Sequence, residues 1–378
     1  MNYNDYRLYE NPFRLTPPIS SDDVIWAGMH KVKGQLEQRI QIAMRTSVSR
    51  IIINWGNYGS GKTHAAVYFS RTNRLEEIST EVGTSNALSI KLNLPRTSKD
   101  IVQAFWRALL GQLSFSSLIQ DIHRLRETFT QVDDFEAVIS ALANDNVIQQ
   151  LFVQLADIKQ DDLPLLESYL YGDSTKSTLG KLNLPIGIGD DEQVVNLIST
   201  LFNCLTYNKQ IYSTVLLWVD EFEDIDTLSK ANADRFTSFL RQLIDKTPNN
   251  LTLFLNFTPK RFMNIEDLSV YMGEALLSRA GVRISFDEPT LEESKEYLSE
   301  LLNNPKFRTK GTGITNKFYP FSHEVATYVL QHIGRRSIRR INEAFSIILE
   351  LALVEGEQPE ITVPFVEKIK GEIIAWEN

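Results

Sequence analysis

The sequence predicts an α/β fold in which helices cover both faces of a parallel sheet and a separate helical unit follows. Short, apolar, β-branched segments alternate with longer stretches of helical spacing, which is the pattern of such a sheet. After residue 289 the strand-like segments stop, and almost every remaining stretch has helical spacing. With 378 residues, 43% of them apolar, the chain can bury more than one core.

Composition and charge exclude several classes of protein. One cysteine, Cys204, cannot form a disulfide framework or a multi-cysteine zinc site, and the 5 histidines show no pair at ligand spacing. No apolar run approaches the roughly 20 residues that span a bilayer, and the N-terminus lacks a signal sequence, so we expect a cytoplasmic protein without membrane contact. The net charge of −9 opposes general binding of nucleic acid but allows a local basic stripe.

The first hundred residues show two strands and the helices around them. Apolar residues recur at helical spacing over 32–43, which predicts an amphipathic helix. Arg50–Trp55 is a β-branched run typical of a buried strand, and Lys62–Arg74 is compatible with a helix. Ala87–Leu92 is expected to form a second strand, and the polar residues of Thr97–Asp100 are typical of a helix start.

The pattern is helical from about residue 97 to residue 205, which predicts a large insertion outside the sheet. Its helices are expected over Ile101–Leu113, Leu118–Phe129, Phe135–Ala143, Val147–Ala156 and Glu192–Leu205. Gly180–Gly189 is punctuated by glycine and proline and is expected to be a loop.

Three further strands and a helical tail complete the chain. The strands are expected over Val215–Val219, Leu251–Phe257 and Val282–Phe286, with a helix over Ala231–Ile244 between the first two. The tail helices are expected over Leu291–Asn303, His323–His332 and Ser337–Val354. We therefore predict an N-terminal entry segment and helix (1–50), an α/β core (51–96 with 206–288), a helical insertion (97–205) and a C-terminal helical unit (289–378).

A complete phosphate-binding motif, G-x-x-x-x-G-K-[ST], follows the first strand. Its members are Gly56, Asn57, Tyr58, Gly59, Ser60, Gly61, Lys62 and Thr63. Glycines let the backbone wrap a phosphate closely, and the N–H groups of the loop and of the following helix start supply positive potential. Lys62 adds a charge at the β- and γ-phosphates, and the Thr63 hydroxyl can ligate Mg²⁺. The motif predicts that the chain binds ATP with Mg²⁺.

Two carboxylates end the apolar strand at 215–219. Asp220 is expected to hold the magnesium through water, and Glu221 to polarise the attacking water as general base. Glu223, two residues further on, is the alternative base. Ligands of parallel α/β sheets bind at the carboxyl ends of strands, which favours these roles over a solvated acidic loop.

Together these motifs resemble the AAA+ ATPases, and within them the origin-recognition-like branch and its bacterial relatives. The resemblance implies a P-loop core with a parallel sheet and a C-terminal helical lid. Trp26-Ala27-Gly28 is similar to the entry segment of that branch. Leu251–Asn256 is similar to the sensor-1 strand, which implies that Asn256 orients the attacking water. The alternative is that Asn256 only satisfies the backbone at the strand end.

The resemblance also implies roles for two arginines. Leu276–Arg279 looks like the segment that carries the arginine finger, so Arg279 would reach the nucleotide of the neighbouring subunit. Gly334–Asn342 resembles the sensor-2 region of the lid, which implies that Arg339, or second to it Arg336, contacts the nucleotide. A plain surface arginine at 279 and a basic face for nucleic acid at 335–340 are the alternatives.

The insertion departs from a minimal P-loop core, because Lys62 and Asp220 are 220 − 62 = 158 residues apart. Within it, Leu165–Asp173 and Asp190–Glu192 look like the bacterial ATP-binding proteins of phage-exclusion (BREX-type) systems. The chain also resembles transposon target-selection ATPases.

We therefore expect an AAA+ ATPase that assembles as a homo-oligomeric ring or filament and acts with a protein partner in bacterial or mobile-element DNA transactions, in phage defence or transposition target selection. Any contact with DNA is expected through its phosphate backbone, from a local stripe. Candidates for that stripe are Lys31, Lys33, Arg71, Arg74, Lys260 and Arg261. The alternatives are a non-catalytic, ATP-dependent signalling scaffold and a P-loop kinase of a small acceptor.

Overall fold

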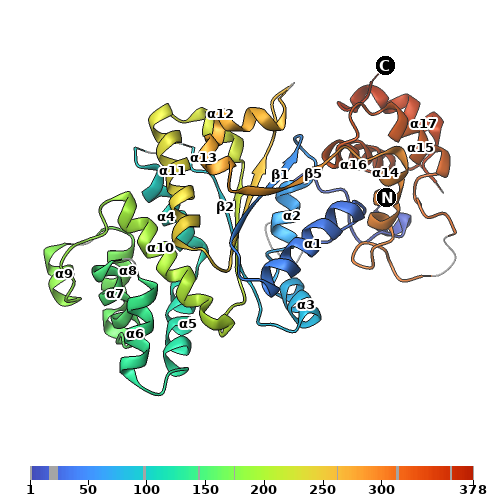
Figure 1. Cartoon of the computed structure of the whole chain (residues 1–378). Coiled ribbons are helices and arrows are strands. Elements are labelled where there is room, and N and C mark those ends of the chain that lie inside the picture. The colour runs from blue at the N-terminus through green and yellow to red at the C-terminus, as the bar shows by residue number, and fades with distance from the viewer. Residues whose placement is uncertain are drawn as a thin grey trace. The chain divides into compact units, whose positions relative to one another are not determined.

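The computed structural model describes residues 2–16, 24–96, 99–143, 145–173, 175–261, 263–311, 315–357 and 360–377, apart from the side chain of Gln160. The chain forms two compact units (Figure 1). The sheet unit comprises Leu36–Asn54 and Phe69–Ile284, and the loop–lid unit comprises Met1–Gln35, Trp55–Tyr68 and Ser285–Asn378. Within the described residues, no helix combines the length and the apolar character needed to cross a membrane.

A five-stranded sheet organises the sheet unit, and its α/β architecture confirms the predicted fold class. The strands are β1 (Arg50–Gly56), β2 (Leu88–Asn93), β3 (Val215–Asp220), β4 (Leu251–Phe257) and β5 (Ala280–Phe286). They lie in the order β2-β3-β4-β1-β5, and the pairs β2–β3 and β3–β4 are parallel. The residues of β3 and β4 are all buried, as expected of central strands. The register pairs Asn93 with Asp220, so the last residues of β2 and β3 lie side by side.

Helices fill the long segment between β2 and β3, and no strand occurs there among the residues that the structure describes. They are α4 (Ile101–Gln112), α5 (Phe115–Glu127), α6 (Val132–Leu142), α7 (Asn146–Ala156), α8 (Leu163–Leu170), α9 (Lys176–Lys181) and α10 (Asp191–Leu205). Figure 1 shows α5–α9 on the far side of α10 from the sheet. The Asp100 side chain caps α4 by accepting from the Gln103 N–H, whereas Thr97 and Ser98 lie outside the described residues.

Aromatic packing holds the insertion to the rest of the sheet unit. The entry helix is α1 (His30–Arg45). The other helices of the sheet unit are α3 (Thr72–Val82), α11 (Lys230–Lys246), α12 (Leu268–Met272) and α13 (Glu274–Leu277). The ring of Phe105, on α4, lies 5.3 Å from Phe236 and 5.5 Å from Phe239, both on α11. All three rings are fully buried, so α4 joins the hydrophobic core of the sheet unit.

The loop–lid unit has its own hydrophobic core, to which the N-terminal segment contributes. Its helices are α2 (Lys62–Tyr68), α14 (Leu291–Leu302), α15 (His323–His332), α16 (Ile338–Glu355) and α17 (Val363–Ile369). The Phe345 ring of α16 packs 5.0 Å from Phe321 and 5.7 Å from Phe13. Tyr6 and Leu8 are also fully buried in this cluster, so these two residues, which precede α1, belong to the core of the loop–lid unit.

The helix expected over Lys62–Arg74 is two helices, and that prediction was wrong. α2 ends at Tyr68 and α3 begins at Thr72, with Arg71 in an extended conformation between them. Beside the break, the Ser70 hydroxyl lies 2.9 Å from the Ser89 hydroxyl of β2. A tertiary contact of this kind leaves the helical spacing of the sequence unchanged, so periodicity does not predict the break.

Candidate nucleotide site

The loop between β1 and α2 has a backbone that glycine makes possible. Gly59 and Gly61 have φ angles of +75° and +99°, in the left-handed region. A Cβ atom added at Gly59 would lie 2.6 Å from the Cβ of Arg339, and one added at Gly56 would lie 2.7 Å from the carbonyl oxygen of Phe286. The loop therefore requires glycine at positions 59 and 61 for its conformation, and at positions 56 and 59 for its close packing against Phe286 and Arg339.

Lys62 closes the loop on itself. Its side chain is buried, and its ammonium donates to the carbonyl oxygens of Gly56 at 2.6 Å and of Asn57 at 3.1 Å. Ser60 is also buried, Thr63 is half-buried in the first turn of α2, and the Tyr58 side chain is 70% exposed. The loop thus places the positive charge of Lys62 beside a turn with two left-handed glycines. Backbone N–H groups of such turns can form an anion site.

The start of α16 lies directly against this loop. The Arg339 N–H donates to the Gly59 carbonyl at 3.2 Å, and Ser337, the N-cap of α16, accepts from the Arg340 N–H. Arg336 is engaged elsewhere, because its Nε donates to the Pro289 carbonyl at 3.3 Å. Of the two lid arginines that the sequence proposes, Arg339 is therefore the one in contact with the phosphate-binding loop.

A second group of polar residues lies in the sheet unit, around Asp220 at the end of β3. Asp220 is 3% exposed, and its Oδ1 accepts from Asn256 Nδ2 at 3.0 Å while its Oδ2 lies 3.3 Å from Lys91 Nζ. Asn256 in turn accepts, through Oδ1, from Asn54 Nδ2 at 2.8 Å. Lys91 compensates the charge of the buried carboxylate, and the two asparagines fix its orientation.

Glu221 follows in a left-handed conformation, with φ 54° and ψ 39°. Its Oε2 lies 2.9 Å from Arg96 Nη2 and 3.4 Å from Asn93 Nδ2. Arg96 also pairs with Asp224, and hydrogen bonding to Asp224 followed by the charge of Glu221 raises the pKa of the guanidinium. The expected general base is therefore ion-paired within its own unit.

Glu223, the alternative base, has a different role in the structure. Its Oε2 accepts from the backbone N–H of Thr258 at 3.1 Å, just after the end of β4. This hydrogen bond occupies Oε2 and holds the Glu223 side chain at the backbone that follows β4.

Arg279 is held by an acidic partner in the sheet unit. Its Nε and Nη2 donate to the two carboxylate oxygens of Asp245, on α11, at 2.7 and 2.9 Å. Nη1 also donates to the Ala275 carbonyl at 2.5 Å. This bidentate pair fixes the guanidinium at the residue before β5.

The entry segment packs on α2 within the loop–lid unit. The Trp26 ring lies 5.9 Å from the His64 ring and 5.2 Å from the Tyr68 ring. A ring nitrogen of His64 hydrogen-bonds the Ile25 carbonyl at 2.7 Å. Burial lowers the pKa of His64, and this hydrogen bond opposes the shift in part, so the imidazole is neutral at pH 7.

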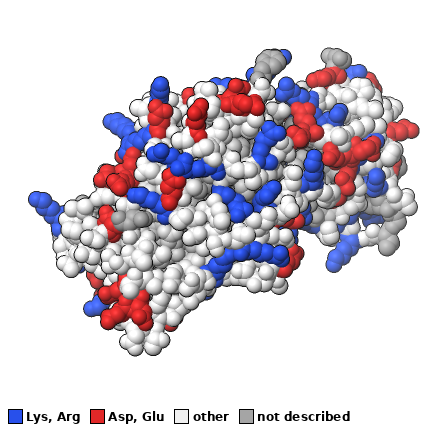
Figure 2. Space-filling view, viewed as in Figure 1, with Lys and Arg blue, Asp and Glu red and all other residues white. Residues whose placement is uncertain are grey.

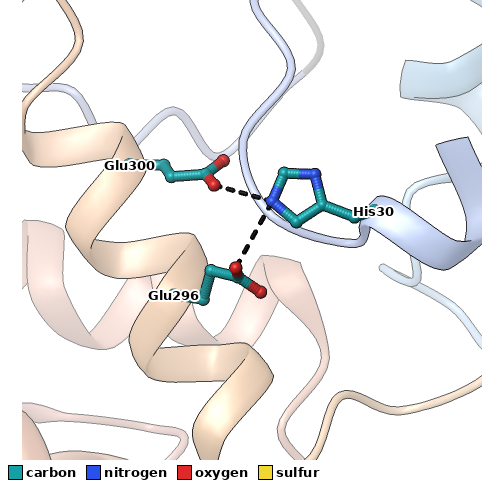
Figure 3. Close-up of side chains that lie close together, drawn as sticks. All are labelled: His30, Glu296 and Glu300. Carbon is teal, nitrogen blue, oxygen red and sulfur yellow. Dashed lines mark hydrogen bonds and ion pairs between the residues drawn. The ribbon is translucent and has the colours of Figure 1, made fainter.

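A cluster of His30, Glu296 and Glu300 fastens the entry segment to α14 (Figure 3). His30 Nε2 lies 2.6 Å from Glu300 Oε1 and 3.5 Å from Glu296 Oε1, and Glu300 Oε2 accepts from the Gly28 N–H at 2.7 Å. The three side chains are 37–52% exposed, which is typical of a surface ion pair.

Most of the basic residues proposed for DNA already have partners within the chain. Arg74 pairs with Glu37 and Glu77, and Lys260 pairs with Asp226. Lys33 lies 5.6 Å from the centre of the Tyr68 ring. On the face shown in Figure 2, basic and acidic side chains are interspersed.

Sequence reasoning missed several residues that contact the predicted ones, among them Asn54, Lys91 and Arg96. Asn54 interrupts an otherwise apolar strand and is fully buried, and a polar residue at such a position is itself a signal of a buried contact. Arg96 has no comparable signal, because its partners lie 125 and 128 residues further along the chain.

Comparison with known proteins relates the fold to two solved structures. No protein-family model and no curated protein matches the sequence. The ORC2 protein of Aeropyrum pernix in its ADPNP–ADP complexes matches 98% of this chain and 73% of that chain, with a TM-score of 0.55 and 12% identity. The ADP form of the same protein matches 98% of this chain and 74% of that chain, with a TM-score of 0.52 and 13% identity. At this identity the likeness establishes the shared fold.

Proposed function

We propose that the chain, which shares the fold of the ORC2 structures, is an AAA+ protein that binds ATP with Mg²⁺ at the Gly56–Thr63 loop and hydrolyses it. The observation that carries the proposal is the loop itself, in which left-handed Gly59 and Gly61 stand beside the buried ammonium of Lys62. Backbone N–H groups and a fixed positive charge are what a triphosphate requires. The ORC2 structures of the same fold hold ADPNP and ADP, which supports a nucleotide as the ligand.

The donor groups of the chain fit Mg²⁺. Thr63 offers a hydroxyl and Asp220 a carboxylate, and Mg²⁺ prefers such hard oxygen ligands. Asp220 is already oriented by Asn256, so its carboxylate is fixed before the ion arrives. When bound with ATP, the ion would neutralise charge on the phosphate oxygens.

The remaining residues receive the roles that their surroundings support. Glu221 would take the proton of the attacking water, and Asn256 would orient that water through its amide. Arg339 would contact the nucleotide from the lid, since its backbone already bonds Gly59. Arg279 would act on the nucleotide of a neighbouring copy in a homo-oligomer.

A nucleotide-dependent switch with slow turnover is the second candidate function. The observation that favours it is the ion pair between Glu221 and Arg96, because it occupies a carboxylate oxygen that would otherwise contact the attacking water. In this scheme ATP binding would promote assembly, and hydrolysis would only reset it.

Variants of Lys62 and Glu221 test the ATPase proposal. Lys62→Ala should weaken ATP binding, because the phosphates lose their counter-charge. Glu221→Gln should keep binding while slowing hydrolysis about 10²-fold or more, the scale of a general base. Nucleotide affinity and phosphate release are the measurements.

Lys295→Ala is the matched control, since this lysine of the same unit pairs with Glu292 on the surface of α14. It should behave as the parent. Parent-like turnover in Glu221→Gln would remove Glu221 from the mechanism and direct attention to Glu223.

We further propose that the oligomer acts with a protein partner on DNA, in phage defence or in transposition target selection. The sequence resemblance supports this setting. A protein of net charge −9 repels phosphates, so binding has to come from a few basic residues and should fall steeply with salt. Fluorescence polarisation with duplex DNA and ATP at low salt measures it, and an absence of binding there would contradict a direct role on DNA.

A further inference from the structure

Three buried polar side chains form a continuous chain across neighbouring strands of the sheet unit. Asp220 lies at the end of β3, Asn256 lies in β4 and Asn54 lies in β1, and these strands are adjacent in the order β3-β4-β1. Their residues are 3%, 0% and 0% exposed. Asn54 donates to Asn256 at 2.8 Å, and Asn256 donates to Asp220 at 3.0 Å.

The carboxylate determines the direction of both amides. An ionised carboxylate only accepts hydrogen bonds, so Asn256 has to turn its Nδ2 toward Asp220. Its Oδ1 then points to Asn54, which has to present its own Nδ2. If the Asn256 amide turned over, its oxygen would face the carboxylate and its N–H groups would face the N–H groups of Asn54. The orientation of Asn256 therefore depends on a donor at position 54.

Asn54 is not explained by a contribution to stability. Its Oδ1 is buried and has no hydrogen-bond partner. A buried acceptor of this kind opposes folding, because it loses water and gains no donor in exchange. The residues before it, Ile51, Ile52 and Ile53, are apolar and buried, as is usual in such a strand.

We propose that Asn54 is a positioning residue of the ATPase, which acts through Asn256. By occupying Oδ1 of Asn256, it keeps both N–H groups of that amide on the side of Asp220. The N–H that bonds Asp220 orients the carboxylate, and in the proposed ATPase the attacking water would meet the Asn256 amide in this one orientation. The inference rests on the proposed function and adds to it a residue outside the phosphate-binding loop and the strand-end carboxylates.

The test combines Asn54→Leu, Asn256→Leu and the double variant with steady-state ATPase assays, ATP-binding measurements and thermal unfolding. Asn54→Leu should lower kcat about ten- to a hundredfold, the scale of misplacing a catalytic group by about 1 Å. The Kd for ATP should stay within about twofold of the parent. The double variant should be no slower than Asn256→Leu alone, because Asn54 acts only through that amide.

Thr252→Val is the matched control, because Thr252 is a buried polar residue of β4, 1% exposed, that is not one of the three hydrogen-bonded side chains. Its kcat should equal that of the parent. If Asn54→Leu does not fold, Asn54→Ser replaces it, since the shorter hydroxyl cannot span the same distance to Asn256 and should give the same loss of kcat.

Two outcomes would overturn the role of Asn54. The first is a folded Asn54→Leu or Asn54→Ser variant with the kcat of the parent. The second is a double variant whose kcat is lower than that of Asn256→Leu by the same factor by which Asn54→Leu lowers the kcat of the parent. A parent protein that binds no ATP or does not hydrolyse it would instead refute the proposed function, and the role of Asn54 with it.

Discussion

At the scale of single residues, the surroundings of Glu221 decide how fast the proposed reaction can run. Oε2 of the carboxylate is paired with the exposed guanidinium of Arg96, and this ion pair has to open before that oxygen can contact the attacking water. Arg96→Ala should therefore raise basal ATPase activity about two- to fivefold, a modest change because exposed ion pairs are weak. Phosphate release at low salt measures the effect.

Arg107→Ala is the control for this prediction. Arg107 pairs with Asp173 within the helical insertion and makes no contact with the strand-end carboxylates. Its removal should leave turnover unchanged. If Arg96→Ala were slower than the parent, Arg96 would be positioning Glu221 rather than restraining it.

Single residues also show how far the site could be predicted from the sequence. Gly56–Thr63 is a local motif, so the sequence alone is enough to name its residues and their chemistry. The bond between Asn54 and Asn256 joins positions 202 residues apart, and no local pattern predicts which two strands become neighbours. The position of Asn54 as a polar residue in an apolar strand predicts a buried contact, but it does not predict that Asn256 is the partner.

At the scale of elements, helical spacing predicted the long helices, and continuous apolar or β-branched runs predicted the strands. The strand expected over 251–257 and the helix expected over 323–332 agree with β4 and α15 residue for residue. Short helices are harder to predict from the sequence. α8, which was not expected, begins with Pro164 in its first turn, where proline is tolerated although it commonly ends helices.

The hydrophobic core of the loop–lid unit joins segments that lie far apart in the sequence. Tyr6, Leu8 and Phe13 share a hydrophobic core with residues of α14–α17. Contacts between residues so far apart along the chain have no signature in local composition. The four parts predicted from the sequence describe proposed roles, and they stay a prediction.

At the scale of the whole molecule, the proposed function requires more than one copy of the chain. Arg279 is fixed by Asp245 in the sheet unit, and we propose that it completes the nucleotide site of a neighbouring copy. Arg279→Ala alone should bind ATP and be inactive, and Lys62→Ala alone should be inactive as well. Each inactive variant still carries the group that the other lacks.

A mixture of Arg279→Ala and Lys62→Ala should therefore regain part of the activity. Some interfaces will combine an intact loop on one side with an intact Arg279 on the other, and their number should rise with total protein concentration as assembly does. An arginine supplied in trans is worth roughly 10³–10⁵ in rate, so even a minority of repaired interfaces is measurable as phosphate release.

A second mixture, of Lys62→Ala with Glu221→Gln, separates action in trans from mere subunit mixing. Lys62 and Glu221 are proposed to serve the same nucleotide within one copy, so no interface between these two variants restores a complete site. This mixture should stay inactive at every concentration. If it recovered as well as the first mixture, or if neither recovered where the parent is oligomeric, Arg279 would not act across an interface, and the proposed assembly would lose its catalytic role.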